Sequence, residues 1–336
     1  MIKREVIHKS EKSSRILEIE LNQKTLSTPT YFPAISSYGI KPPFCDLLYL
    51  LNHHMYPRVL VSAYDLFHME ANEKRRALSL VGKFMEKGIL FMDSGLFESW
   101  WKMDKKWDIS SYKGILSQVD FDLYSSFDVY RDEERGYEDF RERTYDNILE
   151  SSVFLNSVAL FAILHESSPI QLLKLVEEYL KEHADTCGNI AVAERDIGKS
   201  IQERTETIFE IRKLIDNYDD RNLLHVLGCG HPLSLLLYSY CGADTFDSLD
   251  WLKYIVDPDD LSVIDFAYLD LLKCGCRVCT DMPYRKADYL ERVLLHNLLF
   301  YQDFVMQMQS LIRNNNLKAY LKRHVGEEIM NNIEKY

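Results

Sequence analysis

The chain has 336 residues and a net charge of −12, from 40 Lys and Arg against 52 Asp and Glu. Hydrophobic residues make up 46% and charged residues 27%, which is typical of a folded globular protein and excludes a disordered or fibrous one. The longest apolar runs, such as 158–164, are too short to cross a bilayer, and the first 15 residues lack the apolar core of a secretory signal. We therefore expect a cytoplasmic protein without a membrane segment.

Short apolar or β-branched runs recur along the chain and predict eight β-strands. They are 30–35, 58–63, 88–93, 121–128, 159–164, 189–194, 223–228 and 243–247. Segments with helical periodicity separate them, and the clearest are 170–184 and 198–217. Strand–helix alternation is typical of a parallel sheet, and eight such units in about 250 residues predict an α/β fold of the (β/α)8 TIM-barrel type. A doubly wound open sheet is the alternative, but no GxGxxG motif follows the first strand.

The pattern changes after residue 250. A cluster of cysteines occupies 274–279, and a long helix is expected from about 286 to 312. We therefore divide the chain into a catalytic barrel over 1–252, with its core strands at about 30–247, and a zinc-binding helical subdomain over 253–336 that packs on the barrel.

The cysteine cluster is the strongest metal-binding pattern in the chain. Cys274, Cys276 and Cys279 form CxCxxC, and His296 follows on the predicted helix. Three thiolates and one imidazole are a tetrahedral ligand set for Zn²⁺, and four protein ligands leave no open position, so the zinc would be structural. The alternative is a group of buried thiols without metal.

Polar residues stand where several of the predicted strands end. Active-site groups of a (β/α)8 barrel lie at the carboxyl ends of its strands. These ends carry Asp93, Asp128, His165 with Glu166, Glu194, Gly228 and Asp247. Asp93 is the most informative, because Ser94-Gly95 follows it as a sharp turn that would expose its side chain. The alternative is that each aspartate only caps the next helix.

The segment directly after Asp93 combines aromatic and basic residues. Trp100, Trp101 and Trp107 are interleaved with Lys102, Lys105 and Lys106. Aromatic rings can stack on bases while lysines contact phosphates, so the segment is a candidate nucleic-acid-binding rim. The alternative is a surface helix whose tryptophans pack on the barrel.

Together these motifs resemble the tRNA-guanine transglycosylase superfamily. The resemblance rests on DSGLFES (93–99), FDVY (127–130), VLGCGHP (226–232), TFDS (245–248) and CxCxxC followed by His-Asn on a helix, in that order. It implies a (β/α)8 barrel with a zinc subdomain. It also implies a reaction in which a carboxylate attacks C1′ of a nucleotide and expels guanine, while a second carboxylate handles the proton.

The resemblance assigns roles to individual residues. Asp247 matches the nucleophile, Asp93 the general acid/base, and Asp128 the carboxylate that binds the guanine edge. Leu227 and Gly228 match part of the base-pocket wall.

Other strand ends depart from the family pattern. His165 stands where the family has glutamine, and Glu194 lies where a Gly-Gly-Leu turn is usual. LDWLK replaces the run that normally follows the nucleophile. We therefore expect His165 and Glu194 to line a rebuilt base pocket, and we favour the branch that inserts a 7-deazaguanine base of the preQ0 type into DNA.

Three alternatives stay open: the same base exchange on tRNA, a non-catalytic nucleic-acid-binding subunit, and an unrelated zinc hydrolase. The family often dimerises through its zinc subdomain. The apolar face of 294–312, with Leu295, Leu298, Phe304, Val305 and Met308, is either such a homodimer surface or a face that packs on the barrel.

Overall fold

The computed structural model describes residues 3–37, 42–129, 136–153 and 159–336, and its centre is a closed barrel of eight parallel strands. The strands lie around the barrel in chain order, and β11 closes it by pairing with β4. They are β4 (Thr30–Ile35), β5 (Arg58–Ser62), β6 (Ile89–Asp93), β7 (Leu123–Ser125), β8 (Leu160–Ile163), β9 (Ile190–Ala193), β10 (Leu224–Leu227) and β11 (Thr245–Ser248). All eight predicted strands and the predicted (β/α)8 barrel are confirmed.

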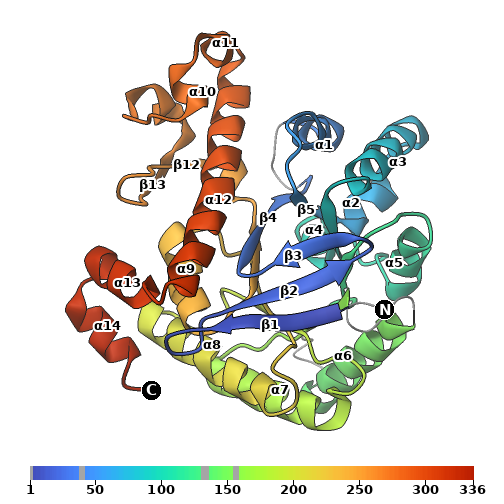
Figure 1. The fold of residues 1–336 in the computed structure, drawn as a ribbon. Helices are drawn as coiled ribbons and strands as arrows, with labels where there is room; N and C mark the ends of the chain where they lie inside the picture. The colour runs from blue at the N-terminus through green and yellow to red at the C-terminus, as the bar shows by residue number, and fades with distance from the viewer. Residues whose placement is uncertain (1–2, 38–41, 130–135, 154–158) are drawn as a thin grey trace.

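Helices surround the barrel, as Figure 1 shows. They are α1 (Phe44–His53), α2 (Ala63–His68), α3 (Ala71–Met85), α4 (Leu96–Trp101), α5 (Ile109–Leu116), α6 (Gly136–Ser152), α7 (Pro169–His183), α8 (Ile201–Asp216) and α9 (Pro232–Tyr240). The two helices that the sequence predicts most clearly begin at side-chain caps. Ser168 and Ser200 accept hydrogen bonds from backbone N–H groups in the first turns of α7 and α8.

An antiparallel sheet that the sequence analysis did not anticipate covers one end of the barrel. It consists of β1 (Lys3–Lys9), β2 (Arg15–Leu21) and β3 (Lys24–Ser27). Arg4 donates hydrogen bonds to Asn189 and Asn222, which lie just before β9 and β10, and Lys24 pairs with Asp122, which precedes β7. The sheet therefore closes the amino-terminal end of the barrel and leaves the carboxyl end open.

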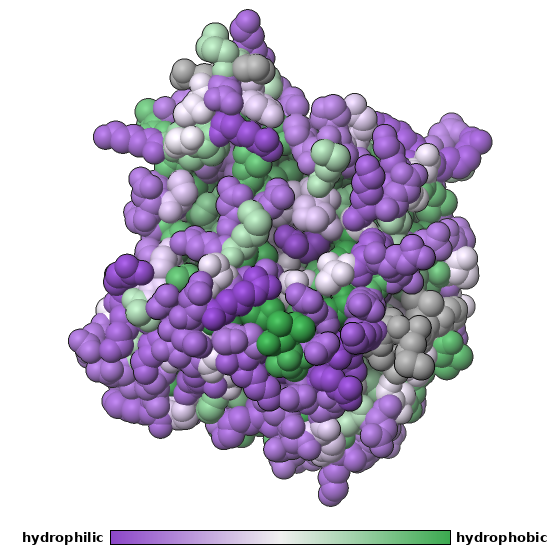
Figure 2. All heavy atoms as spheres, in the orientation of Figure 1, coloured by the Kyte–Doolittle hydropathy of each residue, from purple (hydrophilic) through white to green (hydrophobic). Residues whose placement is uncertain are grey.

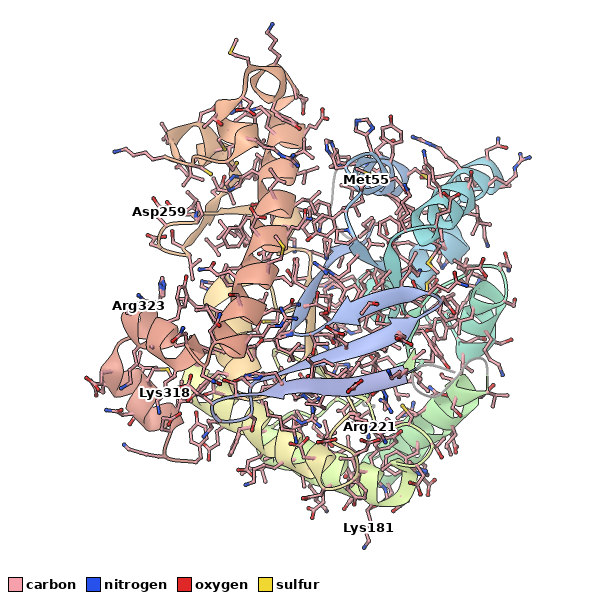
Figure 3. All side chains as sticks on the ribbon, in the orientation of Figure 1. Met55, Lys181, Arg221, Asp259, Lys318 and Arg323 are labelled. Carbon is pink, nitrogen blue, oxygen red and sulfur yellow. The ribbon has the colours of Figure 1, made fainter. Side chains whose placement is uncertain are left out.

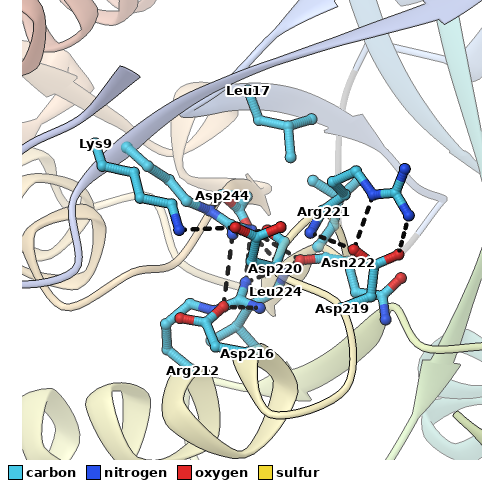
Figure 4. Close-up of polar contacts among 12 residues, drawn as sticks. Lys9, Leu17, Arg212, Asp216, Asp219, Asp220, Arg221, Asn222, Leu224 and Asp244 are labelled. Carbon is cyan, nitrogen blue, oxygen red and sulfur yellow. Dashed lines mark hydrogen bonds and ion pairs between the residues drawn. The ribbon is translucent and has the colours of Figure 1, made fainter. Parts of the chain in front are cut away.

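A buried charge network holds this sheet in place, and Figure 4 shows part of it. Arg15 of β2 binds both carboxylate oxygens of Asp244 at 2.8 Å, and Arg212 of α8 reaches the same carboxylate at 3.2 Å. Asp216 binds Arg212 at 2.8 Å from one turn further along α8. Because removal of one partner would leave a buried charge unpaired, these residues fasten sheet, barrel and helix together. They lie at the amino-terminal end of the barrel, where residues of (β/α)8 barrels contribute to stability and not to catalysis.

The region after the barrel contains β12 (Tyr254–Val256), β13 (Val263–Asp265), α10 (Arg277–Thr280), α11 (Met282–Arg285), α12 (Tyr289–Arg313), α13 (Leu317–Val325) and α14 (Glu327–Ile333). The predicted long helix corresponds to α12, which runs from the small subdomain along the side of the barrel (Figure 1). Tyr301 of α12 stacks on Tyr31 of β4 with ring centroids 4.2 Å apart. The helix is thus shared between the subdomain and the barrel, and the proposed boundary at 252/253 stays a prediction.

The apolar face of α12 is covered within the chain. Leu295, Leu298, Phe304, Val305 and Met308 are all buried, and all but Leu295 join the core that includes the barrel. Of the two alternatives for this face, the structure therefore favours packing on the barrel, and it does not support a homodimer formed through these side chains.

The outer surface is mainly polar. In the view of Figure 2, hydrophilic side chains cover most of the molecule, with small hydrophobic patches between them. Figure 3 shows labelled side chains such as Lys181 and Arg323 pointing outward at the edge. Within the described ranges, no helix combines the length and apolar character needed to span a bilayer.

Candidate active site

A cavity of about 400 Å³ opens at the carboxyl ends of the barrel strands. Its walls include all seven residues that the sequence predicts for catalysis and base binding: Asp93, Asp128, His165, Glu194, Leu227, Gly228 and Asp247. A pocket of this size at this end of a (β/α)8 barrel is the default position for an active site. The structure therefore brings the predicted residues together, while their individual roles remain predictions.

Asp93 ends β6 and projects into the cavity from a tight turn. Its Oδ2 accepts the N–H of Gly95 at 2.9 Å, and its Oδ1 accepts the hydroxyl of Ser125 at 3.2 Å. Gly95 has a φ of +77°, and a side chain there would collide with Tyr64, so the turn requires glycine. Burial, together with the negative charges of Asp247 and Asp128, raises the pKa of Asp93 to about 6, against the opposing hydrogen bonds.

Asp247 lies on β11 at the floor of the cavity. Its Oδ1 accepts two hydrogen bonds, from Nε2 of His225 at 3.1 Å and from the backbone N–H of Gly228 at 3.2 Å. Gly228 follows β10 with a φ of +72°, which favours glycine and directs its N–H toward the carboxylate. The arrangement holds one carboxylate oxygen firmly at the bottom of a pocket, as a carboxylate nucleophile requires.

Asp128 and His165 belong to a charged triad that the sequence analysis saw only in part. Nε2 of His165 lies 2.9 Å from Asp128, and Nδ1 lies 2.5 Å from Asp196 in the loop after β9. Burial lowers the pKa of His165, but the two carboxylates outweigh it and raise the pKa to about 10. The imidazole is therefore a cation at neutral pH, and both of its N–H groups are engaged.

Glu194 lies in the cavity wall with two partners of its own. Its Oε1 accepts hydrogen bonds from Arg204 at 3.1 Å and from the hydroxyl of Tyr238 at 2.9 Å. Arg204 projects from α8 and also lines the cavity. Glu194 therefore offers a substrate an acceptor that is already oriented by neighbouring donors.

A further acid, which the sequence analysis did not single out, lies in the wall beside Asp93. Glu98 of α4 is buried and accepts a hydrogen bond from Ser36. Burial and the nearby charges of Asp65 and Asp93 raise the pKa of Glu98 to about 8. Glu98 is therefore mostly protonated at neutral pH.

The aromatic and basic segment divides into a buried and an exposed part. Trp107 is buried and donates its indole N–H to the carbonyl of Ser94 at 3.0 Å, so it packs on the barrel. Trp100 and Trp101 have exposed fractions of 53% and 46%. Lys102, Lys105 and Lys106 are also exposed, and Lys102 contacts Ser37 at 2.7 Å. Because residues of α4 line the cavity, the exposed part lies on its rim.

The predicted metal ligands form a compact cluster away from the cavity. One ligand atom from each of Cys274, Cys276, Cys279 and His296 lies within 4.8 Å of all the others. Nδ1 of His296 is 3.5 Å from the sulfur of Cys279, and Nε2 is 2.9 Å from the carbonyl of Val256. A proton on Nε2 donates to that carbonyl and leaves Nδ1 free to bind a metal. The four side chains can therefore hold a metal ion.

The sequence does not single out three residues that line the cavity or contact its walls: Asp196, Arg204 and His225. Asp196 and Arg204 reach the site from a loop and a helix, beyond the strand ends that were searched. His225 lies within β10, and its only signal was a histidine at an inward position of an otherwise apolar strand. In FDVY, Tyr130 lies outside the described residues.

These features define a class of protein: a (β/α)8 barrel whose open end gathers carboxylates in different environments, with a separate Cys₃His cluster beside it. Carboxylates held in different protonation states are typical of acid–base and covalent catalysis.

Comparison with known proteins agrees with this class. The tRNA-guanine(15) transglycosylase of Nanoarchaeum equitans is 24% identical over 98% of this chain and 79% of its own length. That of Pyrobaculum aerophilum is 21% identical over 92% of this chain and 64% of its own length. That of Aeropyrum pernix is 32% identical over 108 residues, which are 30% of this chain and 21% of that protein. No profile of a known protein family matches the chain. Over most of its length the chain is thus similar to proteins named tRNA-guanine(15) transglycosylase.

Proposed function

We propose that this protein is a guanine transglycosylase that exchanges a guanine base in a nucleic acid for a 7-deazaguanine base. The observation that carries the proposal is the meeting of Asp93, Asp128 and Asp247 in one cavity at the carboxyl end of the barrel. The similarity to tRNA-guanine(15) transglycosylases over nearly the whole chain supports it.

The cavity residues suit the chemistry in the following way. A carboxylate oxygen of Asp247 attacks C1′ of the target nucleotide, and the glycosidic bond breaks with its electron pair leaving on guanine. Asp93 gives a proton to the departing base. The incoming base then returns a proton to Asp93 and attacks C1′, which releases Asp247 as a carboxylate. The target base must leave its stack to enter the cavity.

We propose tRNA as the nucleic acid. The departures of the base pocket from the family pattern favour DNA instead. The relatives that cover most of the chain are named for tRNA, and they support the tRNA alternative better than the DNA hypothesis, which is not confirmed. The cytoplasmic location and the 7-deazaguanine of the preQ0 type also stay predictions.

Parallel incorporation assays test the proposal. Labelled guanine and labelled preQ0 are offered with unmodified tRNA and with duplex DNA. We expect label in tRNA. Label only in DNA would show that DNA is the substrate and tRNA is not. That result would support the DNA hypothesis that the departures of the base pocket favour. Absence of label from both polymers would contradict the proposed activity.

The raised pKa of Asp93 predicts how the stability of the fold depends on pH. The pKa of about 6 lies above the ordinary value of 3.8. As the pH rises, Asp93 therefore ionises in the unfolded state before it ionises in the folded state. This lowers the free energy of unfolding progressively between about pH 4 and about pH 6, and the loss persists above pH 6. We expect Asp93→Asn to stabilise the fold by about 1–3 kcal/mol at pH 8 and by almost nothing near pH 4. Thermal unfolding at both pH values measures this. A variant that is less stable than wild type at pH 8 would contradict it.

A second prediction concerns the exposed lysines of the rim and the salt dependence of tRNA binding. Changing Lys102, Lys105 and Lys106 together to glutamine should weaken tRNA binding and lower the slope of log K against log salt concentration by about 2, because each phosphate contact contributes about 0.7–0.9. Binding titrations at several salt concentrations measure the slope. Lys181→Gln, an exposed lysine on α7 at the edge of the molecule in Figure 3, is the control. An unchanged slope in the triple variant would exclude these lysines from the interface.

A further inference from the structure

One layer of the barrel interior contains a histidine among phenylalanines. Interior residues of a (β/α)8 barrel form layers of four side chains from alternate strands. Here the layer below the cavity consists of Phe32 of β4, Phe91 of β6, Phe161 of β8 and His225 of β10, and all four are fully buried. The ring of His225 lies 5.0 Å from that of Phe91 and 5.7 Å from that of Phe161, between centroids.

A histidine at this depth needs partners for both of its nitrogens. Burial of an imidazole in an apolar layer is costly unless it is hydrogen-bonded, and a fourth phenylalanine would avoid that cost. Nδ1 of His225 lies 2.8 Å from the hydroxyl of Thr245, and Nε2 lies 3.1 Å from Oδ1 of Asp247. Its two polar contacts are therefore with β11, and one of them is with the carboxylate at the cavity floor.

These partners place a hydrogen on Nε2 of His225. An ionised carboxylate can only accept, so Nε2 must donate to it. A hydroxyl can both donate and accept, so Thr245 satisfies Nδ1 whether or not that nitrogen carries a hydrogen. The apolar layer around the ring disfavours a charge, and in the neutral ring the hydroxyl of Thr245 donates to Nδ1.

The same contacts distinguish the two oxygens of Asp247. Oδ1 receives both the Nε2–H of His225 and the backbone N–H of Gly228, at 3.1 and 3.2 Å. Among the described residues, both hydrogen bonds to this carboxylate end on Oδ1. Asp93, Asp250 and the thiol of Cys229 also interact electrostatically with Asp247.

We propose that His225 is a positioning residue for the nucleophile: its neutral ring, with the hydrogen on Nε2, holds Oδ1 of Asp247 and leaves Oδ2 to attack C1′. The inference rests on the proposed function for the identity of the reaction. It adds which oxygen of Asp247 attacks, and which side chain keeps that carboxylate aligned at the bottom of the cavity.

Two variants separate positioning from simple filling of the barrel. His225→Phe completes a layer of four phenylalanines, so it should keep the fold while removing the donor. We expect the rate of covalent adduct formation and kcat to fall by about 10²-fold, as for loss of one donor to a reacting oxygen, with KM for the incoming base almost unchanged. His225→Gln, whose amide can still donate, should recover at least about tenfold of the rate.

A measurement on the resting protein keeps the inference independent of activity. The ¹⁵N chemical shifts of the His225 ring should identify a neutral imidazole protonated on Nε2. A charged ring or a hydrogen on Nδ1 would overturn the inference, whether or not base exchange is found.

The kinetic results can also overturn it. One such result is adduct formation by His225→Phe at the wild-type rate. Another is an equal loss of rate in His225→Phe and His225→Gln together with an equal loss of thermal stability. A wild-type protein that exchanges no base would contradict the proposed function only, and the ring nitrogens would still decide the state of His225.

Discussion

Asp247→Asn should abolish base exchange and leave the protein folded. The amide cannot serve as the attacking nucleophile, so we expect kcat to fall by at least about 10⁴-fold, as when other enzymes lose a nucleophile. The Asn side-chain oxygen can still accept the hydrogen bonds from His225 and Gly228, so the floor of the cavity should keep its shape. The wild-type protein should form an adduct with tRNA that survives denaturation, and the variant should form none.

The controls for this prediction use the same chemical change elsewhere. Asp259→Asn replaces an exposed aspartate near β13, which Figure 3 labels at the edge of the molecule, and should form the adduct at the wild-type rate. Circular dichroism and thermal unfolding check that both variants fold. An adduct that persists in Asp247→Asn would remove Asp247 as the nucleophile and shift attention to Asp93, the acid that interacts with it across the cavity.

The barrel could be predicted from the sequence because its strands are buried on both faces. Runs such as Thr30–Ile35 and Ile89–Asp93 are therefore apolar throughout or nearly so. The sheet at the amino-terminal end escaped prediction for the opposite reason. In β1 (Lys3–Lys9), no residue is fully buried, and the polar sequence resembles a surface loop. Its position depends on Arg15 and Asp244, which are 229 residues apart in the chain.

The candidate site was predictable where topology alone places a residue. Asp93 and Asp247 stand at strand ends, and all parallel strands of a barrel end at the same face. The partners of these residues depend on side-chain geometry that a single sequence does not contain. Asp196 reaches His165 from a loop, and Arg204 reaches Glu194 from the first turns of α8. His225 lies inside a strand, where a lone histidine is most often only a satisfied core residue.

The metal cluster makes the prediction with the largest expected effect on stability. We propose that Cys274, Cys276, Cys279 and His296 bind one structural Zn²⁺. Structural zinc contributes about 10–16 kcal/mol of apparent binding free energy in small zinc domains, which is as large as the stability of a typical domain. The hydrophobic cluster of this subdomain is small and centred on Ile255, Leu269 and Val293, so it offers little to replace the metal.

Cys276→Ser should therefore lose zinc and unfold the subdomain before it affects the barrel. His296 lies in the first half of α12, whereas Tyr301 anchors the helix to β4 by stacking on Tyr31. We expect hydrogen exchange to rise over 254–299 while the barrel strands stay protected, and zinc measured by elemental analysis to fall from about one ion per chain to a small fraction of that.

Cys45→Ser, at a buried cysteine on α1 outside the cluster, is the matched control and should retain its zinc. Equal zinc content in Cys276→Ser and wild type would show that the ligand set is wrong. Loss of zinc with simultaneous loss of barrel protection would show instead that the metal supports the whole fold through α12.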